Sequence, residues 1–393
     1  MIALLVALFP LAGVAHAADL TDGDALDEGA STWTDAPEDP PEVDGPSEDP
    51  GDPIINGTPA SEDEYPQAGA MIIDADLTLT GYGTYSLRSF VCSSTLIAPD
   101  VVMLAAHCVD ELTYTQGQGS LTINEIRWTR LADLEDWDGT TMRKADWPTD
   151  SVAAADWVEN EDFNLRQMKT GIAENHDIAL LFLDTPVLDT PFAYIPTTDE
   201  GDQLAEDAPV TIVGWGQQEA TDYGETPARG TYALKYMGDT VVGELGDAEF
   251  QVGPEESEAR KCHGDSGGPT FIRVSTDSSE TLRVVGVTSH SYDLTDCANK
   301  GGVDTRVMYL RDWVEDQMTQ ACEDGTRVWC DEPGLPLPPE PVAETDDTGS
   351  PDTGEEKGRA CACSSASAST SAPWALGLLS LALLRRRRVS DRA

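Results

Sequence analysis

The sequence predicts an all-β fold, on three observations. Short segments rich in Val, Ile and Leu recur through the middle of the chain, as in "DIALLFLD", "VTIVGWG" and "LRVVGVTSH". Gly, Pro, Asp or Asn bound these segments, and such residues commonly end strands. Helical periodicity is weak until residues 309–321, where apolar side chains fall near one face. Many short strands followed by one late helix are typical of a β-sandwich or a β-barrel.

The chain of 393 residues begins with two segments that we do not expect in the fold. The opening "MIALLVALFPLAGVAHA" is apolar and ends in a small-x-small triplet, so residues 1–17 are predicted to be a signal peptide. Residues 18–53 are rich in Asp, Glu, Pro and Gly and contain no Lys or Arg. Such a segment cannot bury enough apolar surface to fold, so it is predicted to be a disordered leader or propeptide. Residues 54–330 are predicted to be the globular domain.

Two further segments follow the globular part. Residues 331–360 are rich in Pro, Asp and Thr and are predicted to be an extended linker. Residues 361–393 contain a patch of small residues, an apolar run at 372–384 and four arginines at 385–388. As a helix, that run crosses a bilayer core of about 30 Å only if the small residues before it take part. The arginines are expected to stay in the cytoplasm, which leaves the globular domain outside.

The net charge limits the expected partners, and the cysteines raise the question of disulfides. The formal net charge is −48, with 72 Asp and Glu against 24 Lys and Arg. Because nucleic-acid binding rests on neutralising phosphates, nucleic acid is excluded as the expected partner. The eight cysteines lie at 92, 108, 262, 297, 322, 330, 361 and 363. Export permits disulfides, but counting alone does not give their pairing.

One segment, "ARKCHGDSGGP" at 259–269, suggests nucleophilic chemistry. A serine such as Ser266 needs a nearby base, a group that orients this base, and donors for the developing oxyanion. His107 in "LAAHC" is a candidate base, and Asp177 in "HDIALL" opens a buried run where an orienting carboxylate would be desolvated. Gly264 has no Cβ and could turn its N–H inward beside that of Ser266. A glycine-rich turn without catalysis remains the alternative for this serine.

"LAAHC", "HDIALL" and "CHGDSGGP", in this order, resemble the three signature segments of chymotrypsin-like serine proteases. The resemblance covers about residues 54–319. It implies two perpendicular antiparallel six-stranded β-barrels with a C-terminal helix. It also implies that His107 is the general base, Asp177 its orienting group and Ser266 the nucleophile. The oxyanion hole would be formed by the N–H groups of Gly264 and Ser266.

The same resemblance implies disulfides and an activation step. The expected pairs are Cys92–Cys108, Cys262–Cys297 and Cys322–Cys330. Members of the family are cut to expose an apolar N-terminus whose amine pairs with the aspartate before the serine. "IING" at 54–57 resembles that terminus, so Ile54 and Asp265 are the expected partners. Because Pro53 precedes the cut, another protease is expected to remove the leader.

In this family the residue six before the serine lies at the base of the primary specificity pocket. Here it is Arg260, which favours acidic side chains before the cleaved bond. The alternative is that Arg260 turns to solvent or pairs with a local carboxylate. Ser289, His290 and Ser291 occupy the segment that usually forms the pocket wall, and His290 replaces the usual tryptophan.

We therefore expect a monomeric serine endopeptidase that is secreted, made as a zymogen and free of cofactor and metal. Its partners would be protein or peptide substrates, an activating protease and C-terminal sorting machinery. The tail resembles the sorting signal of myxobacterial-type surface proteins, which implies the surface of a Gram-negative bacterium and processing at Cys361 or Cys363. The alternatives are a non-catalytic protease homologue that acts as a surface-binding module, and an esterase with the same triad.

Overall fold

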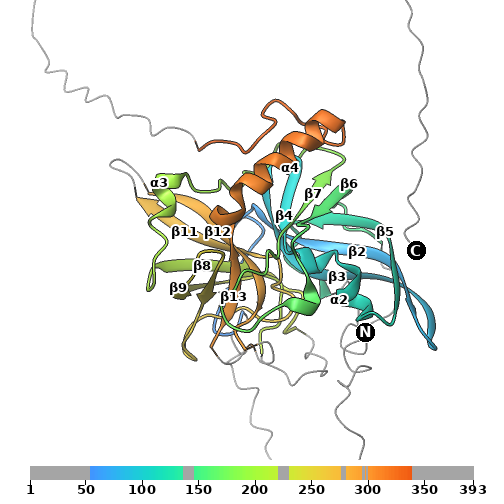
Figure 1. Cartoon of the computed structure of the whole chain (residues 1–393), viewed down its shortest axis with the longest axis horizontal. Helices are drawn as coiled ribbons and strands as arrows, with labels where there is room; N and C mark the ends of the chain where they lie inside the picture. Colours follow the sequence, from blue (N-terminus) through green and yellow to red (C-terminus); the bar gives the residue numbers. More distant parts are fainter. Residues whose placement is uncertain are drawn as a thin grey trace, which may run out of the picture. The chain divides into compact units, whose positions relative to one another are not determined.

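The computed structural model describes residues 54–135, 146–219, 230–275, 280–293, 297 and 300–338 (Figure 1). The predicted signal peptide, the acidic leader, residues 339–360 of the linker and the anchor segment lie outside these residues. Among the described residues, no helix has the length and apolar character needed to cross a membrane.

The first half of the described chain forms a closed antiparallel barrel. Its strands follow the order β2-β3-β4-β7-β6-β5 around the barrel. The shortest strands, such as "VVML" and "ALLFL", are buried at every position, so both of their faces contact protein. The strand bounds are β2 Ala68–Leu79, β3 Gly83–Ala98, β4 Val101–Leu104, β5 Gly119–Thr129, β6 Val152–Glu159 and β7 Ala179–Leu183.

The second half forms another closed six-stranded barrel, because β8 and β9 pair and join the two ends of the order β9-β10-β13-β12-β11-β8. A short strand, β1 (Thr58–Pro59), adds to β9. The prediction of two six-stranded antiparallel barrels is therefore confirmed. The strand bounds are β8 Pro209–Gly214, β9 Tyr236–Leu245, β10 Glu249–Val252, β11 Pro269–Ser275, β12 Glu280–Ser291 and β13 Gly302–Arg306.

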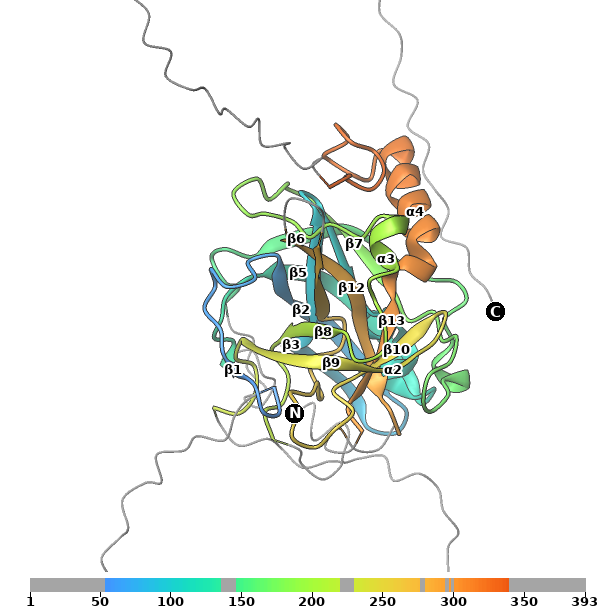
Figure 2. The ribbon, with the colours of Figure 1, turned by 90° about the vertical axis from the view of Figure 1, so that its left-hand side faces the viewer.

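The predicted late helix is α4 (Arg311–Asp324), which follows a 3₁₀ turn, η4 (Val307–Leu310). It lies on the outside of the strands in both views (Figure 1; Figure 2). Val314, Met318 and Ala321 are its buried residues, and the helix ends at Gly325 in the left-handed conformation. The shorter helical segments are η1 Ala106–Cys108, α2 Glu111–Thr115, η3 Leu165–Gln167 and α3 Thr198–Gly201.

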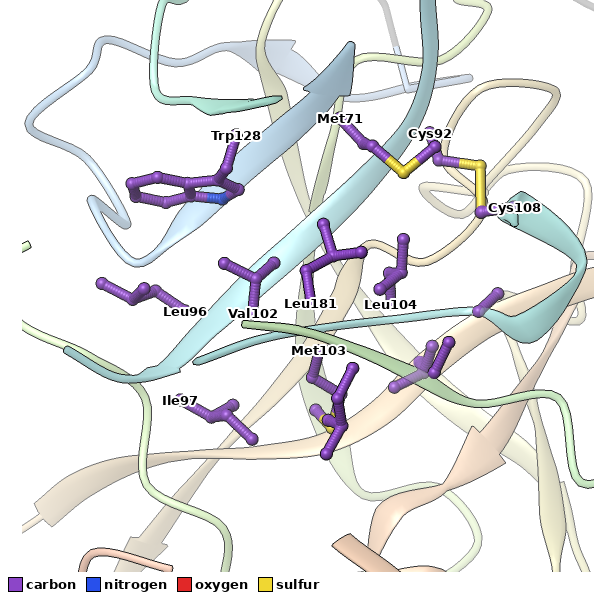
Figure 3. Packing of buried hydrophobic residues seen from close by; sticks show 14 of the residues in the cluster. Met71, Cys92, Leu96, Ile97, Val102, Met103, Leu104, Cys108, Trp128 and Leu181 are labelled. Carbon is purple, nitrogen blue, oxygen red and sulfur yellow. A yellow bond between two sulfur atoms is a disulfide. The ribbon is translucent and has the colours of Figure 1, made fainter. Parts of the chain in front are cut away.

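Apolar side chains fill the first barrel, and several of them surround the strand that leads to η1. Val102, Met103 and Leu104 of β4 are fully buried and pack in the same cluster as Leu181 of β7 and Trp128 of β5 (Figure 3). This packing fixes the end of β4, from which the chain passes directly into η1. The barrel core thus determines where the residues of η1 lie.

Three disulfides tie together segments of the fold. They join Cys92 to Cys108, Cys262 to Cys297 and Cys322 to Cys330. These are the three pairs that the resemblance implies. The first connects β3 to η1 (Figure 3). The second connects the loop before β11 to the segment before β13.

A buried ion pair fastens the segment after α4 to the first barrel. Arg327 Nη2 lies 2.8 Å from Asp100 Oδ1, and both side chains are fully buried. The other carboxylate oxygen of Asp100 accepts the backbone N–H groups of Val328 and Trp329. The Arg327 guanidinium also donates to the carbonyl oxygen of Pro333. Each buried charge is therefore paired and hydrogen-bonded.

Removing one partner of this pair should destabilise the fold strongly. We expect Arg327→Met to lower the free energy of unfolding by about 3–5 kcal/mol, since it leaves the Asp100 carboxylate buried without its cation. Glu125→Gln is the control, because Glu125 pairs with Arg127 at a part-exposed site and should change stability by less than about 1 kcal/mol. Equilibrium denaturation measures both, and equal effects would contradict the assignment.

Candidate active site

A buried carboxylate lies between the two barrels. Asp177, two residues before β7, is fully buried and accepts His107 Nδ1 at 2.7 Å and His107 N at 2.9 Å. The second barrel supplies two more contacts: the Ser289 hydroxyl donates to the carboxylate at 2.6 Å, and the Thr305 hydroxyl donates to the Asp177 carbonyl at 3.0 Å. Both carboxylate oxygens are thus engaged, and His107 is fixed with Nδ1 toward the acid. The opposite nitrogen, Nε2, is left for chemistry.

The electrostatics of this pair favour a charged imidazole. Burial by itself would lower the pKa of His107, but the charge of Asp177, its hydrogen bond and the charge of Asp110 outweigh burial, so the pKa is raised. Burial would raise the pKa of Asp177, but His107 and the hydrogen bonds from His107 and Ser289 lower it overall. The pair can therefore hold a proton on His107 beside an ionised Asp177.

The loop that carries Ser266 packs against the segment that leads to His107. Gly267 N donates to the Thr288 carbonyl at 2.8 Å, and Thr288 N donates back to the Gly268 carbonyl at 3.0 Å. A Cβ at Gly267 would lie 3.0 Å from Ala105 N, two residues before His107, and Gly267 has a φ of 79°. Only glycine fits this approach without strain. The serine and the histidine are thereby brought to the same region, and Ser266 is partly exposed.

The same loop presents two backbone donors. Within the described residues, the N–H groups of Gly264 and Ser266 have no protein acceptor, whereas Asp265 N donates to the Cys262 carbonyl. The carbonyl oxygen of Gly264 is held by Ser93 N at 3.1 Å and by the Ser93 hydroxyl at 2.9 Å. Gly264 has a φ of 97°, which residues with a side chain rarely adopt. Two N–H groups oriented by a fixed loop are what an oxyanion hole requires.

Asp265 anchors this loop from inside. Its carboxylate is fully buried and accepts Gly216 N and Cys262 N, each at 2.8 Å. A Cβ at Gly214 would lie 2.1 Å from the carboxylate, and one at Gly216 would lie 2.5 Å from its Cγ, so the two glycines of "GWG" make room for it. Burial raises the pKa of Asp265 to about 6, although the hydrogen bonds from Cys262 N and Gly216 N act to lower it.

The predicted activation and pocket residues lie together. Ile54 is 1% exposed and belongs to the apolar cluster of the second barrel. Next to it, the Ile55 carbonyl accepts Arg260 N at 2.9 Å. The stem of Arg260 lies against Gly253, and Arg260 is only 3% exposed, so it does not turn to solvent. Its role in specificity stays a prediction.

Sequence reasoning missed the partners of the second cation, Lys261. Lys261 Nζ lies 2.8 Å from Asp304 Oδ2 and donates to the Thr270 hydroxyl at 2.7 Å, and the pair is almost completely buried. Burial lowers the pKa of Lys261, although Asp304 opposes this. Asp304 lies on β13, far along the chain. The acid of the short segment "GGVDTRV" was the signal in the sequence.

The predicted pocket wall makes contacts that the sequence did not reveal. Ser289 supports Asp177, as described above. His290 is part-buried, with Nδ1 at 3.1 Å from the Ser289 hydroxyl and Nε2 at 3.3 Å from the Gly171 carbonyl. Burial lowers the pKa of His290. Ser291 is partly exposed at the end of β12.

Two clusters of cysteine and histidine occur in the described part of the chain, but neither is a credible metal site. They are Cys92, His107 and Cys108, and Cys262, His263 and Cys297. In each cluster both cysteines form a disulfide, which leaves one imidazole as a ligand. His263 is exposed at the rim of the loop.

Comparison with known proteins agrees with this architecture. The trypsin family model matches residues 54–314, so the chain belongs to the trypsin family of serine endopeptidases. The chain is 28% identical to a trypsin from Saccharopolyspora erythraea over 234 residues, which cover 58% of this chain and 86% of the relative. It is 25% identical to phenoloxidase-activating factor 1 from Holotrichia diomphalia, covering 67% and 69% of the two chains, and 24% identical to brachyurin from Leptuca pugilator, covering 67% and 98%.

The pKa of His107 provides a direct test of the buried pair. We expect NMR titration to place it above its ordinary value of 6.5, because Asp177 overcomes the effect of burial. Asp177→Asn should bring it below 6.5, since burial then dominates. Asp110→Asn, which removes the weakest of the causes, should lower it by less. A pKa that is unchanged in Asp177→Asn would contradict the assignment.

Proposed function

We propose that this chain is a serine endopeptidase that cleaves peptide bonds through His107, Asp177 and Ser266. The observation that carries the proposal is the buried contact between His107 Nδ1 and the Asp177 carboxylate at 2.7 Å, which leaves Nε2 to act as the base. The two N–H groups without acceptors in the serine loop support it further.

The proposed reaction has two halves. Ser266 Oγ attacks the peptide carbonyl carbon while its proton passes to His107 Nε2, and the oxyanion accepts the N–H groups of Gly264 and Ser266. His107 then gives that proton to the amine nitrogen as the peptide C–N bond breaks. The amine leaves, and the acyl group stays on Ser266. In the second half, a water molecule gives its proton to His107 and attacks the acyl group. The bond to Ser266 Oγ then breaks, Oγ regains a proton from His107, and the carboxylic acid product leaves. Asp177 stays ionised and stabilises the imidazolium in each half. Because His107 must start neutral, the rate should rise with pH through its raised pKa.

A fluorophosphonate probe tests the nucleophile. We expect one adduct on Ser266, with loss of fluoride, because only an activated serine attacks the phosphorus. Mass spectrometry locates the adduct. Ser266→Ala should abolish labelling. Ser120→Ala, which changes an exposed serine of β5, is the matched control that should retain it.

A protein that folds but does not react would instead be the non-catalytic homologue. A protein that reacts and turns over esters, but not casein, would be the esterase. Either outcome would contradict the endopeptidase.

Removal of the leader before Ile54 is part of the proposal. Ile54 is buried in the second barrel and its neighbour Ile55 pairs with Arg260, so this segment already belongs to the fold. A new ammonium on Ile54 near Asp265 would favour the ionised carboxylate and order the loop of Ser266. Since Pro53 precedes the bond, a protease of other specificity would make the cut. Active protein should therefore begin at Ile54, and an N-terminus at residue 18 or 19 would contradict this.

Specificity is proposed to favour Glu or Asp before the cleaved bond, on the strength of Arg260. A guanidinium binds a carboxylate through paired N–H donors. We expect a peptide library to show cleavage after acidic residues and little after Lys or Arg. Arg260→Ala should reduce cleavage after Glu by about tenfold or more. Strong cleavage after Lys or Arg by the unchanged protein would contradict the proposal.

We also propose that the protease acts outside the cell or on its surface as a monomer. The three disulfides support an oxidising compartment. The predicted signal peptide, residues 339–360 of the linker and the anchor segment lie outside the described residues. Peptide substrates, an activating protease and sorting machinery are the partners that follow from this proposal.

A further inference from the structure

The segment that leads to Asp177 is fastened to the second barrel by a buried acid. Glu249, the first residue of β10, has no exposed surface. Its Oε2 accepts Ala173 N at 2.7 Å, and its Oε1 accepts Asn175 Nδ2 at 3.0 Å. Both donors lie two to four residues before Asp177. One carboxylate of the second barrel thus holds two points of this segment.

Other contacts place the same segment, which we call the clasp loop (residues 171–175). Gly171 N donates to the Tyr292 carbonyl at 2.7 Å, and the Gly171 carbonyl faces His290 Nε2. Ile172 packs near Gly246, which itself donates to the Glu249 carbonyl at 2.9 Å. The clasp loop therefore rests on β10 and β12, although it leads into β7 of the first barrel.

We propose that Glu249 is a positioning residue for the catalytic reaction: it holds the clasp loop so that Asp177 keeps its place against His107. This inference rests on the proposed function. Glu249 does not touch the reacting atoms, and it acts through Asn175 and the backbone of residue 173.

The ionised form of Glu249 suits this task better than the neutral form. A carboxylate offers acceptor oxygens to both donors, and such charge-assisted hydrogen bonds are stronger than neutral ones. A protonated carboxyl keeps one strong acceptor and gains a proton that needs an acceptor of its own. Its grip on the clasp loop is therefore weaker.

Burial supports a pH dependence for this contact. It raises the pKa of Glu249 to about 7, with the negative charge of Asp177 acting in the same direction and the hydrogen bonds from residues 173 and 175 acting against it. Other charged or titratable groups of the surrounding elements are Glu174 in the clasp loop itself, His290 on β12, Tyr292 directly after β12 with its partner Glu244 on β9, and Asp304 and Arg306 on β13. Arg306 Nη1 lies 3.4 Å from the Gly246 carbonyl. Raising the pH through about 7 should strengthen the clasp.

The free energy of unfolding should fall as the pH rises, whereas the clasp becomes stronger. A carboxyl whose folded pKa lies above its ordinary value of 4.5 costs stability when it ionises, so the folded state loses stability as the pH rises from below 4.5 past about 7. If Glu249 only stabilised the fold, its ionisation would change stability without raising the reactivity of the active site.

The test compares Glu249→Gln with the unchanged protein. The variants are made as full chains and matured identically with a protease that cuts before isoleucine. The readout is the second-order rate constant for fluorophosphonate labelling at pH 5.5 and pH 8.5. Gln keeps the size and one acceptor oxygen of the protonated acid. We expect labelling to be about tenfold slower at pH 8.5 and within about twofold of the unchanged protein at pH 5.5. The thermal midpoint at pH 8.5 should not fall.

Two further variants complete the design. Glu206→Gln changes an exposed acid between α3 and β8, away from the clasp loop, and should label normally at both pH values. Asn175→Ala removes one donor and should slow labelling at pH 8.5 even if Glu249→Gln does not fold. If the unchanged protein labels but Glu249→Gln labels equally well, or is slowed by the same factor at both pH values, the positioning role is wrong. If the unchanged protein does not label at Ser266, the proposed function itself fails, and this inference fails with it.

Discussion

The structure depends on a carboxylate that sits where the two barrels meet. Asp177 belongs to the first barrel by sequence, but the hydroxyls of Ser289 and Thr305 from the second barrel bind it. A buried charge is tolerable only when it is paired and hydrogen-bonded. The barrels must therefore pack so that His107 and the Ser289 hydroxyl reach the same carboxylate, while the Thr305 hydroxyl reaches the backbone carbonyl of Asp177. The contact between His107 and Asp177 and the packing of the two barrels therefore follow from the same requirement, that this buried charge be paired.

Glycines, which have no Cβ, allow close contacts around the loop that carries Ser266. The loop of Ser266 approaches the first barrel at Gly267, and the carboxylate of Asp265 occupies the space that a Cβ at Gly214 or Gly216 would fill. These glycines come from two distant segments, "GWG" and "GDSGG". They allow buried contacts to hold the serine loop in place, while the N–H groups of Gly264 and Ser266 stay without a protein acceptor among the described residues.

Short apolar segments bounded by turn residues predicted many strands and one late helix, and the resemblance carried by three signature segments implied the two barrels and the three disulfide pairs. The sequence did not reveal how distant residues meet. Glu249 and Asp304 each lie in a short strand, and only the folded chain shows that Glu249 binds residues 173 and 175 while Asp304 binds Lys261. Ser289 was expected in a pocket wall, yet its hydroxyl also supports Asp177. Such pairings depend on register between strands, which local sequence does not specify.

The most direct measurement is a crystal structure of the matured protein carrying a phosphonyl group on its nucleophile. The account predicts phosphorus bound to Ser266 Oγ, a phosphonyl oxygen within about 3 Å of the N–H groups of Gly264 and Ser266, and His107 still bonded to Asp177 through Nδ1. Phosphorus on another residue, or an imidazole turned away from Asp177 with the oxygen facing no backbone donor, would contradict it.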